Sequence, residues 1–180
     1  MSTSSSQAND TEASCTQACP LGWITLATAT HTDSQSNQQE VITALHFSDE
    51  VDAVIAPCTP LQQEACRQLN EYFLGSRQQF NLPLAPQGTA FQQQVWHALL
   101  TIAHGEHRSY KDIALSINNH KAMRAVGLAN SRNPIALLIP CHRVIGASGK
   151  LVGYAGGIAR KVWLLDHEAS VQAMSHKPSL

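Results

Sequence analysis

The sequence predicts an α+β protein of two domains, a small sheet-containing N-terminal domain and a mostly helical C-terminal domain. Alternating β-rich stretches fall in the first third of the chain, whereas apolar residues at helical spacing dominate the rest. With 180 residues, 43% of them hydrophobic and 14% charged, the chain is long and apolar enough to bury a core.

The N-terminal third contains the strand signals. Residues 1–18 are rich in Ser, Thr and Gln and poor in large apolar side chains, so we expect a disordered leader. Residues 23–30 alternate and are β-rich, and residues 40–47 form a second such run, so the two are expected to pair as a hairpin. Residues 51–56 are interpreted as a third short strand or part of a helix.

The domain boundary is placed by the next two elements. Residues 61–74 have helical spacing and end at Gly75, which can cap a helix C-terminus. Residues 80–86 contain two prolines and are expected to be extended. The predicted organisation is a leader (1–18), an N-terminal domain (19–86), a C-terminal domain (87–170) and a tail (171–180).

Helix signals continue through the C-terminal domain. Thr89 is a candidate N-cap for a helix that runs through Leu100, with Gly105 closing it. Ser109 is a candidate N-cap for a short helix over 110–116, and a second short helix is predicted over 121–129. Two short helices joined by a tight turn indicate a helix-turn-helix unit, and Asn118 in that turn tolerates left-handed geometry.

The five cysteines fit an intracellular protein. The N-terminus has no charged and apolar signal-peptide pattern, and an odd number of cysteines argues against a disulfide framework. Cys15 and Cys19 could bind zinc with His31 or His46, but no clear four-ligand pattern exists, so we expect free thiols and no metal. We expect a cytoplasmic protein, nucleoid-associated in a bacterium or nuclear in a eukaryote, without a membrane span.

Charge is divided unequally between the two halves. Before residue 104, two basic residues face nine acidic ones, which gives a net charge of −7. Residues 104–168 hold nine basic and four acidic residues, a net charge of +5, although the whole chain carries only −1. This asymmetry favours a polyanion partner for the C-terminal half, while a solvated surface of an ordinary domain is the simpler alternative.

Cys141 is the strongest candidate for chemistry. It follows the apolar run 135–139, interpreted as a buried strand or extended segment, and Pro140 stiffens the backbone just before it. His142 provides a titratable base next to the thiol, and a nearby base favours the reactive thiolate. The alternative is a buried structural cysteine.

The motifs around Cys141 resemble those of the O6-alkylguanine-DNA alkyltransferases, also called methylated-DNA–protein-cysteine methyltransferases. The resemblance covers residues 88–168 closely and 20–85 loosely. It is carried by Pro140-Cys141-His142-Arg143-Val144, Asn133-Pro134, Gly153-Tyr154-Ala155-Gly156-Gly157, Lys161-Val162-Trp163-Leu164-Leu165 with Glu168, Ser109-Tyr110, and Arg124-Ala125-Val126-Gly127.

The resemblance implies a ribonuclease-H-like N-terminal domain and a winged helix-turn-helix-like catalytic domain. It further implies a single transfer of an alkyl group from O6 of guanine, and from O4-alkylthymine, to Cys141, which inactivates the protein. His142 would be the base, and Glu168, rather than the adjacent His167, would orient it. Tyr110 would donate a hydrogen bond to the leaving guanine, and Asn133 would tie the active loop.

The same resemblance implies the partner and the pocket. The partner is double-stranded DNA, met in the minor groove by the second helix of the helix-turn-helix, with Arg124 filling the space of an extruded nucleotide. The implied DNA-binding residues are Arg124, Ala125, Ala129, Tyr110 and Lys121, and the implied pocket residues are Val144, Tyr154, Ala155, Gly156 and Gly157. A monomer is expected, and no cofactor.

Three other functions remain open from the sequence. A cysteine hydrolase would use the same thiol, but adjacent residues rarely form a nucleophile–base pair and no oxyanion-hole signature is visible. A non-catalytic lesion sensor would look similar but lack Cys141. A winged-helix binding module would retain every function after Cys141→Ala.

Overall fold

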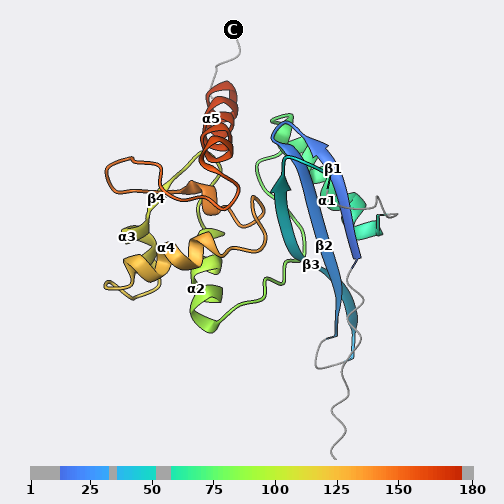
Figure 1. Cartoon of the computed structure of the whole chain (residues 1–180), viewed down its shortest axis with the longest axis horizontal. Helices are drawn as coiled ribbons and strands as arrows, with labels where there is room; N and C mark the ends of the chain where they lie inside the picture. The colour runs from blue at the N-terminus through green and yellow to red at the C-terminus, as the bar shows by residue number, and fades with distance from the viewer. Residues whose placement is uncertain (1–12, 33–35, 52–57, 176–180) are drawn as a thin grey trace, which may run out of the picture.

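The computed structural model describes residues 13–32, 36–51 and 58–175 of the chain. In this part of the chain a sheet with one helix precedes a group of helices, as expected for an α+β protein (Figure 1). The predicted element at residues 51–56 lies almost entirely outside the described residues, and Val51 is not in a helix or strand. No helix of the described residues is both long and apolar enough to cross a bilayer.

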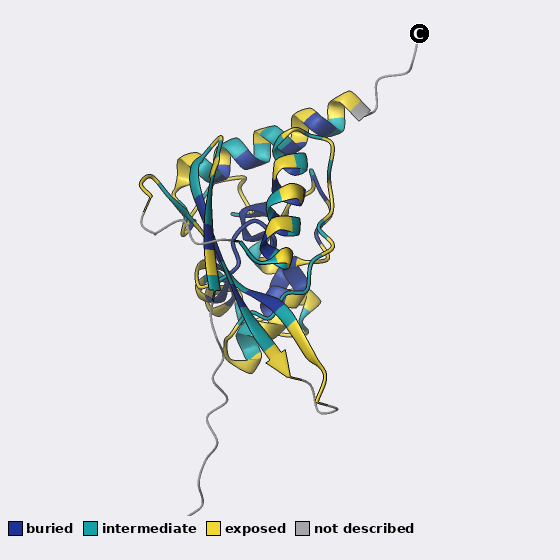
Figure 2. Cartoon of the chain, turned by 90° about the vertical axis from the view of Figure 1, so that its right-hand side faces the viewer, coloured by how far each residue is buried: buried dark blue, intermediate teal, exposed yellow. Residues whose placement is uncertain are grey.

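The N-terminal sheet is three-stranded and antiparallel, in the order β1-β2-β3. Its strands are β1 (Ala13–Cys19), β2 (Gly22–Thr32) and β3 (Gln38–Ser48). Ile24, Leu26 and Thr28 alternate toward the core because successive side chains of a strand point to opposite faces. The far ends of β2 and β3 project into solvent as an exposed hairpin (Figure 2). The predicted hairpin is therefore confirmed.

The leader prediction is wrong for residues 13–18. These residues form β1 and pair with β2 from Ala13↔Thr28 to Cys19↔Gly22. Composition predicted disorder because the stretch has few large apolar side chains, yet pairing satisfies its backbone and Cys15 is only 2% exposed. Residues 1–12 lie outside the described part.

Helix α1 (Pro60–Phe73) covers one face of the sheet. It begins at a capping box in which Thr59 and Gln62 exchange side-chain and backbone hydrogen bonds, with proline in the first turn. The buried Gln62 amide also donates to Ala13 O at 2.9 Å and to Thr28 Oγ1 at 3.1 Å. Gly75, with φ 76°, follows the last turn in left-handed geometry, as predicted.

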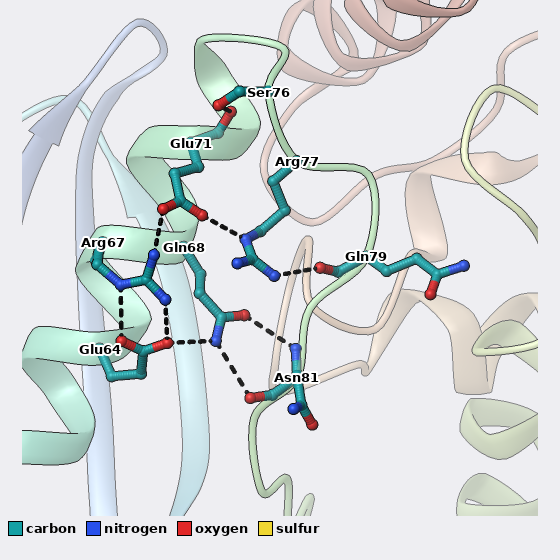
Figure 3. Close-up of polar contacts among 8 residues, drawn as sticks. All are labelled: Glu64, Arg67, Gln68, Glu71, Ser76, Arg77, Gln79 and Asn81. Atoms are coloured by element: carbon teal, nitrogen blue, oxygen red, sulfur yellow. Dashed lines mark hydrogen bonds and ion pairs between the residues drawn. The ribbon is translucent and has the colours of Figure 1, made fainter.

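The segment from Ser76 to Pro86 returns along α1 and is held there by side chains (Figure 3). Gln68 donates to Asn81 O at 3.2 Å and accepts from Asn81 N–H at 2.9 Å. Arg77 pairs with Glu71 at 2.7 Å. The end of the segment then bridges β3 in parallel at Ile42↔Leu84. These contacts fix where the C-terminal domain begins relative to the sheet.

Two helices of the C-terminal domain begin with a capping box. Thr89 caps α2 (Ala90–Leu99) and Ser109 caps α3 (Tyr110–Ser116), as the sequence predicted. Asn118 has φ 56° and makes the left-handed turn that leads to α4 (Met123–Ser131). Trp96 anchors α2 to α4 by donating to Ala129 O at 2.9 Å.

Two corrections concern helix ends. Helix α2 ends at Leu99, so Gly105 (φ 75°) closes the loop that follows rather than the helix itself. Helix α5 (Ile158–Ser175) continues past the predicted domain end at 170, so residues 171–175 are helical rather than a tail. The cause is a buried stripe at helical spacing, which includes Lys161, Leu164 and Val171.

A short parallel pair completes the domain. Strand β4 (Arg108–Ser109) pairs with β5 (Val144–Ile145), which directly follows the 3₁₀ turn η1 (Cys141–Arg143). The pair places the start of α3 next to the turn that carries Cys141. The loop after β5 closes with Gly146 N–H donating to Lys150 O at 2.9 Å.

Candidate active site

The segment leading to Cys141 is held at the edge of the N-terminal sheet. Leu45 in β3 donates to Pro134 O at 2.9 Å and accepts from Ala136 N–H at 3.0 Å. The backbone of the reactive segment therefore pairs with a strand of the other domain (Figure 1). This contact positions Cys141 at the junction of the two domains.

The apolar run 135–139 is not an extended strand, contrary to the prediction. Leu137 has φ 68°, a region that side chains larger than glycine rarely adopt, and Leu138 N–H donates to Ala136 O at 2.8 Å. The chain therefore makes a tight turn within an apolar run. Hydrophobicity indicated burial correctly, because all five residues are buried, but burial does not determine the backbone path.

Cys141 begins the short turn η1 immediately after Pro140. The pyrrolidine ring fits a φ of −79°, and Cys141 N–H donates back to Ile139 O at 2.7 Å, which closes a second tight turn. The thiol is 2% exposed. Burial raises the pKa of Cys141 to about 11, although a hydrogen bond from Asn133 and the charge of Lys161 act to lower it. The free protein therefore holds a neutral thiol.

Two asparagines fasten the turn. Asn133 donates to Ile139 O at 2.8 Å and accepts from Ile135 N–H at 3.0 Å, so it spans the tight turn as the sequence predicted. Asn130, which the sequence did not single out, is 2% exposed and donates to Cys141 O at 3.3 Å. The end of α4 thereby contacts the backbone of the reactive residue.

His142 and Glu168 meet as predicted, although α5 supplies the carboxylate from 26 residues away. His142 Nε2 lies 2.9 Å from Glu168 Oε1, and both side chains are fully buried. Burial lowers the pKa of His142, so the ring is neutral. Because an ionised carboxylate only accepts, Nε2 carries the proton, and no group of the described residues partners Nδ1. His167 instead bonds Tyr72 O at 2.8 Å and stacks on Trp163.

Glu168 has further partners that the sequence did not reveal. Arg143 donates to its two oxygens from Nε and Nη2, with the shortest contact at 2.8 Å. Tyr72 of α1 donates to Oε1 at 2.8 Å, and Gly105 N–H donates to Oε2 at 3.0 Å. Burial acts to raise the pKa of Glu168, but the hydrogen bonds from His142 and Arg143 outweigh it and hold this pKa well below its usual range. A charged residue directly after Cys141 and His142, close to the apolar run 135–139, was the only sequence signal for Arg143.

Lys161 is a second unpredicted buried cation. Its side chain is fully buried and donates to Val144 O at 2.6 Å and to Val152 O at 3.3 Å. Burial lowers its pKa, while the nearby Cys141 acts to raise it. A Cys141 thiolate would therefore form beside a positive charge.

Tyr110 lies at the start of α3 and lines a surface pocket of about 580 Å³. Its hydroxyl donates to Val152 O at 3.1 Å. Burial raises its pKa, and the proximity of Cys141 raises it further. The same pocket is lined by Met123, Arg124 and Gly127 of α4. The structure therefore brings Tyr110 and Arg124 to one surface pocket, whereas Cys141 is buried and does not line it.

Helix α4 presents some of the predicted DNA-binding residues and hides another. Arg124 and Ala125 are exposed, and so is Lys121, which precedes the helix. Ala129 is 3% exposed, so its side chain cannot contact DNA. Five residues beyond Arg124, it is turned by about 140° around the helix axis and packs toward α2.

Some of the predicted pocket residues are buried and others are exposed. Val144 is fully buried and its carbonyl accepts from Lys161. Tyr154 is largely buried, and no group of the described residues partners its hydroxyl. A Cβ on Gly156 would lie 2.8 Å from the Tyr154 ring, so this glycine makes room for the tyrosine side chain. Gly157 (φ 89°) and Ala155 are exposed, next to the start of α5.

Cys15 and Cys19 do not form the considered zinc site. Within the described ranges, no three His, Cys, Asp or Glu side chains come together as a metal site. Cys15 instead lies in β1 with its sulfur 3.9 Å from that of Cys66, so it is not a thiol of a mobile leader.

The fold and the site define a two-domain protein in which a helix-turn-helix unit lies next to a turn that carries a buried cysteine, and this cysteine is followed by a buried histidine–glutamate pair. Two family models match the chain: the ribonuclease-like domain of 6-O-methylguanine DNA methyltransferase over residues 16–86, and the DNA-binding domain of the same enzyme over residues 90–170. The chain belongs to the 6-O-methylguanine DNA methyltransferase family, a class of DNA-repair methyltransferases.

Individual relatives agree with this assignment. The methylated-DNA–protein-cysteine methyltransferase of Methanosarcina acetivorans is 58% identical over 108 residues, which cover 60% of this chain and 69% of the relative. That of Mycobacterium bovis is 60% identical over 106 residues, covering 59% and 64%. The crystal structure of Mycobacterium tuberculosis O6-methylguanine methyltransferase superposes with a TM-score of 0.75 at 44% identity, covering 94% and 96%. The structure of Mycobacterium tuberculosis OGT in complex with DNA gives 0.74 at 46%, covering 88% and 93%.

Proposed function

We propose that this protein repairs DNA by moving the alkyl group of O6-alkylguanine to Cys141 Sγ. The observation that carries the proposal is the buried His142–Glu168 pair next to Cys141, with His142 Nδ1 an acceptor that no group of the described residues uses. This is the nucleophile–base–orienter arrangement of covalent catalysis. O4-alkylthymine presents an equivalent alkyl–oxygen bond and is proposed as a second substrate.

The first step is removal of the thiol proton. With a pKa of about 11, Cys141 is protonated at neutral pH, so neutral His142 accepts its proton at Nδ1, directly or through one water. Glu168 then stabilises the imidazolium at Nε2, as the short contact between them supports. Lys161 lies close enough to Cys141 to stabilise the thiolate.

The second step is in-line displacement. The thiolate attacks the alkyl carbon, the carbon–O6 bond breaks, and guanine leaves as an anion. Tyr110 donates a hydrogen bond to ring N3 of that anion, for which it must release Val152 O. The product is a thioether with no good leaving group, so each molecule acts once and no cofactor is needed.

Double-stranded DNA is the proposed partner. A monomer of the protein would bind it by placing α4 in the minor groove. The exposed Arg124 and Ala125, the basic balance of the C-terminal half and the DNA complex of a close structural relative support this interface. Since Cys141 is buried, the target nucleotide has to leave the base stack, and Arg124 fills the vacated space.

The reaction is tested by incubation with a duplex that carries one O6-methylguanine, followed by intact mass and peptide mapping. The expected result is a gain of about 14 Da on Cys141, one methyl group per molecule. Cys141→Ala should abolish the gain and retain binding to the duplex. No gain on folded wild-type protein would support a sensor or binding module, and turnover of esters at Cys141 would support a hydrolase.

The role of Arg124 is tested by comparing two substrates. Arg124→Ala should slow repair of the duplex by at least about tenfold and leave the reaction with free O6-benzylguanine nearly unchanged, because the free base needs no extrusion. Arg132→Ala, which removes the same charge at the exposed end of α4, is the matched control. Equal loss on both substrates for Arg124→Ala would exclude the proposed role.

A further inference from the structure

Three of the five cysteines meet in the N-terminal domain, apart from Cys141. Cys15 of β1 and Cys66 of α1 have their sulfurs 3.9 Å apart. Cys58, just before α1, hydrogen-bonds Cys15 as well. The function proposed above uses none of these thiols.

The three thiols differ in access and in charge state. Cys15 is 2% exposed, whereas Cys66 is only partly buried. The hydrogen bond from Cys15 lowers the pKa of Cys66, although burial opposes it. The pKa values of Cys15, Cys19, Cys58 and Cys141 are all raised instead. Cys66 is therefore the member of the Cys15–Cys66 pair that a small oxidant meets first, because it is the more exposed of the two residues.

We propose that this cluster is the oxidation site of the protein, where Cys66 reacts with a peroxide and Cys15 then closes a Cys15–Cys66 disulfide. The carrying observation is that the sulfurs of a partly buried and a buried cysteine lie 3.9 Å apart on two elements that are already held together. Gln62 holds α1 against β1 and β2 through Ala13 O and Thr28 Oγ1.

The chemistry balances with hydrogen peroxide as the oxidant. The Cys66 thiolate attacks one peroxide oxygen, the O–O bond breaks, and the departing hydroxide takes up the former thiol proton as water, which leaves a sulfenic acid. Cys15 sulfur then attacks Cys66 sulfur, the S–O bond breaks, and a second water leaves with the Cys15 proton. Two thiols and one peroxide give one disulfide and two waters.

The geometry requires a local adjustment only. A disulfide needs its sulfurs about 2.05 Å apart, so the 3.9 Å separation has to close by less than the width of one atom. Cys141 is expected to remain reduced, because its thiol is buried and its pKa is raised to about 11.

The test uses the reduced full-length protein with one equivalent of hydrogen peroxide, followed by intact mass and non-reducing peptide mapping. The expected result is a loss of about 2 Da and a linked Cys15–Cys66 peptide, with Cys141 still open to alkylation after denaturation. Cys66→Ser should abolish the loss, and Cys19→Ser, on the same strand as Cys15, should retain it.

A second variant traps the sulfenic acid intermediate. It keeps the test valid even if the Cys66→Ser protein does not fold. In Cys15→Ser/Cys58→Ser, where no neighbouring thiol remains, dimedone should label Cys66 as the sulfenic acid. Labelling of Cys141 instead, or a wild-type disulfide through any pair other than Cys15–Cys66, would overturn the proposal. None of these readouts depends on alkyl transfer.

Discussion

The buried carboxylate of Glu168 connects the segment that carries Cys141 with the N-terminal domain. It binds His142 and Arg143 on one side and Tyr72 of α1 on the other. Its two oxygens accept from His142, Arg143, Tyr72 and Gly105. The guanidinium balances the carboxylate charge, so His142 can stay neutral while it donates to Glu168. A base that is neutral before reaction and stabilised once charged is suited to take a proton from a thiol that is itself neutral.

Glu168→Gln should therefore impair both rate and stability. The variant leaves the Arg143 charge buried without its partner, which costs about 3–5 kcal/mol in the free energy of unfolding. It also removes the negative charge that stabilises imidazolium, so single-turnover transfer should slow by about 10²–10⁴-fold. Denaturant unfolding and quench-flow transfer measure the two effects.

Asp166→Asn is the control for this substitution, since it removes an exposed carboxylate from the same helix. Both quantities should stay near wild type in the control. A stable Glu168→Gln protein with unchanged transfer would mean that His142 works without an orienting carboxylate.

The stability of the fold should decrease in two acid steps. Burial lowers the pKa values of His142 and His104, so the unfolded chain binds more protons there as the pH falls below about 6.5. The lowered pKa of Glu168 gives stability that is complete above about pH 4.5 and is lost progressively below it. Urea unfolding between about pH 8 and pH 2 measures both windows.

His104→Gln tests how much His104 contributes to the loss of stability below about pH 6.5. Both ring nitrogens of His104 are buried, without a partner among the described residues, so its removal should flatten the decrease of stability between about pH 6.5 and pH 5. The exposed His97→Gln is the matched control. An equal slope for both variants would assign the upper window to other groups.

The sequence predicted individual contacts where a motif named both partners, and missed those where only the fold brings partners together. The pairing of His142 with Glu168 was predicted, whereas Tyr72 and Lys161 were not. Tyr72 was one position on the apolar face of the predicted helix 61–74, and Lys161 was part of a motif without a role of its own. Their hydroxyl and ammonium groups acquire a role only because α1 and α5 pack against the reactive turn.

At the scale of elements, the α3–turn–α4 unit depends on its caps and on one left-handed residue. Ser109 and Asp112 close a reciprocal capping box at the start of α3. Asn118 takes φ 56° in the turn, and α4 starts without a side-chain cap. The turn, together with the hydrogen bond from Trp96 to Ala129 O, therefore sets the angle at which α4 presents Arg124.

Substitution of Asn118 should separate backbone geometry from side-chain contacts. Asn118→Val should destabilise the protein by about 1–2 kcal/mol, because a β-branched residue is strained at positive φ, whereas Asn118→Gly should be close to neutral. Asn119→Val, at the next exposed position, controls for β-branching in this loop. Thermal or urea unfolding measures the difference, and equal loss at both positions would remove the special role of the turn.

Elements with strong local signals were predicted well, and the reactive segment was not. Caps and apolar spacing identified α1, α2 and α3 because these signals act within one turn of the chain. The path of residues 135–139 instead depends on Asn133 and on the edge of β3. The buried side of Ala129 likewise depends on α2, which no pattern within α4 specifies.

At the scale of the whole molecule, the N-terminal domain supports the active site in two places. Leu45 of β3 pairs with the backbone that leads to Cys141, and Tyr72 of α1 reaches Glu168 across the interface. The segment that joins the domains is held along α1 by the Gln68–Asn81 hydrogen bonds and the Arg77–Glu71 ion pair (Figure 3). The small sheet domain is therefore part of the reactive framework, and disturbing it should affect transfer without any change near the thiol.

Tyr72→Phe tests this connection with the loss of a single oxygen. The ring still packs against Phe73, Phe80 and His104, but Glu168 loses one donor from α1. A hydrogen bond to a charged group contributes about 1.5–3 kcal/mol, so unfolding should become easier by that amount, and transfer should slow severalfold as the carboxylate gains freedom. Glu71→Gln is the control, because Glu71 is adjacent to Tyr72 in α1 but pairs with Arg77 and not with Glu168. This substitution should leave transfer unchanged. If Tyr72→Phe lowers stability while transfer keeps its wild-type rate, the N-terminal domain supports the fold of the site but not its chemistry.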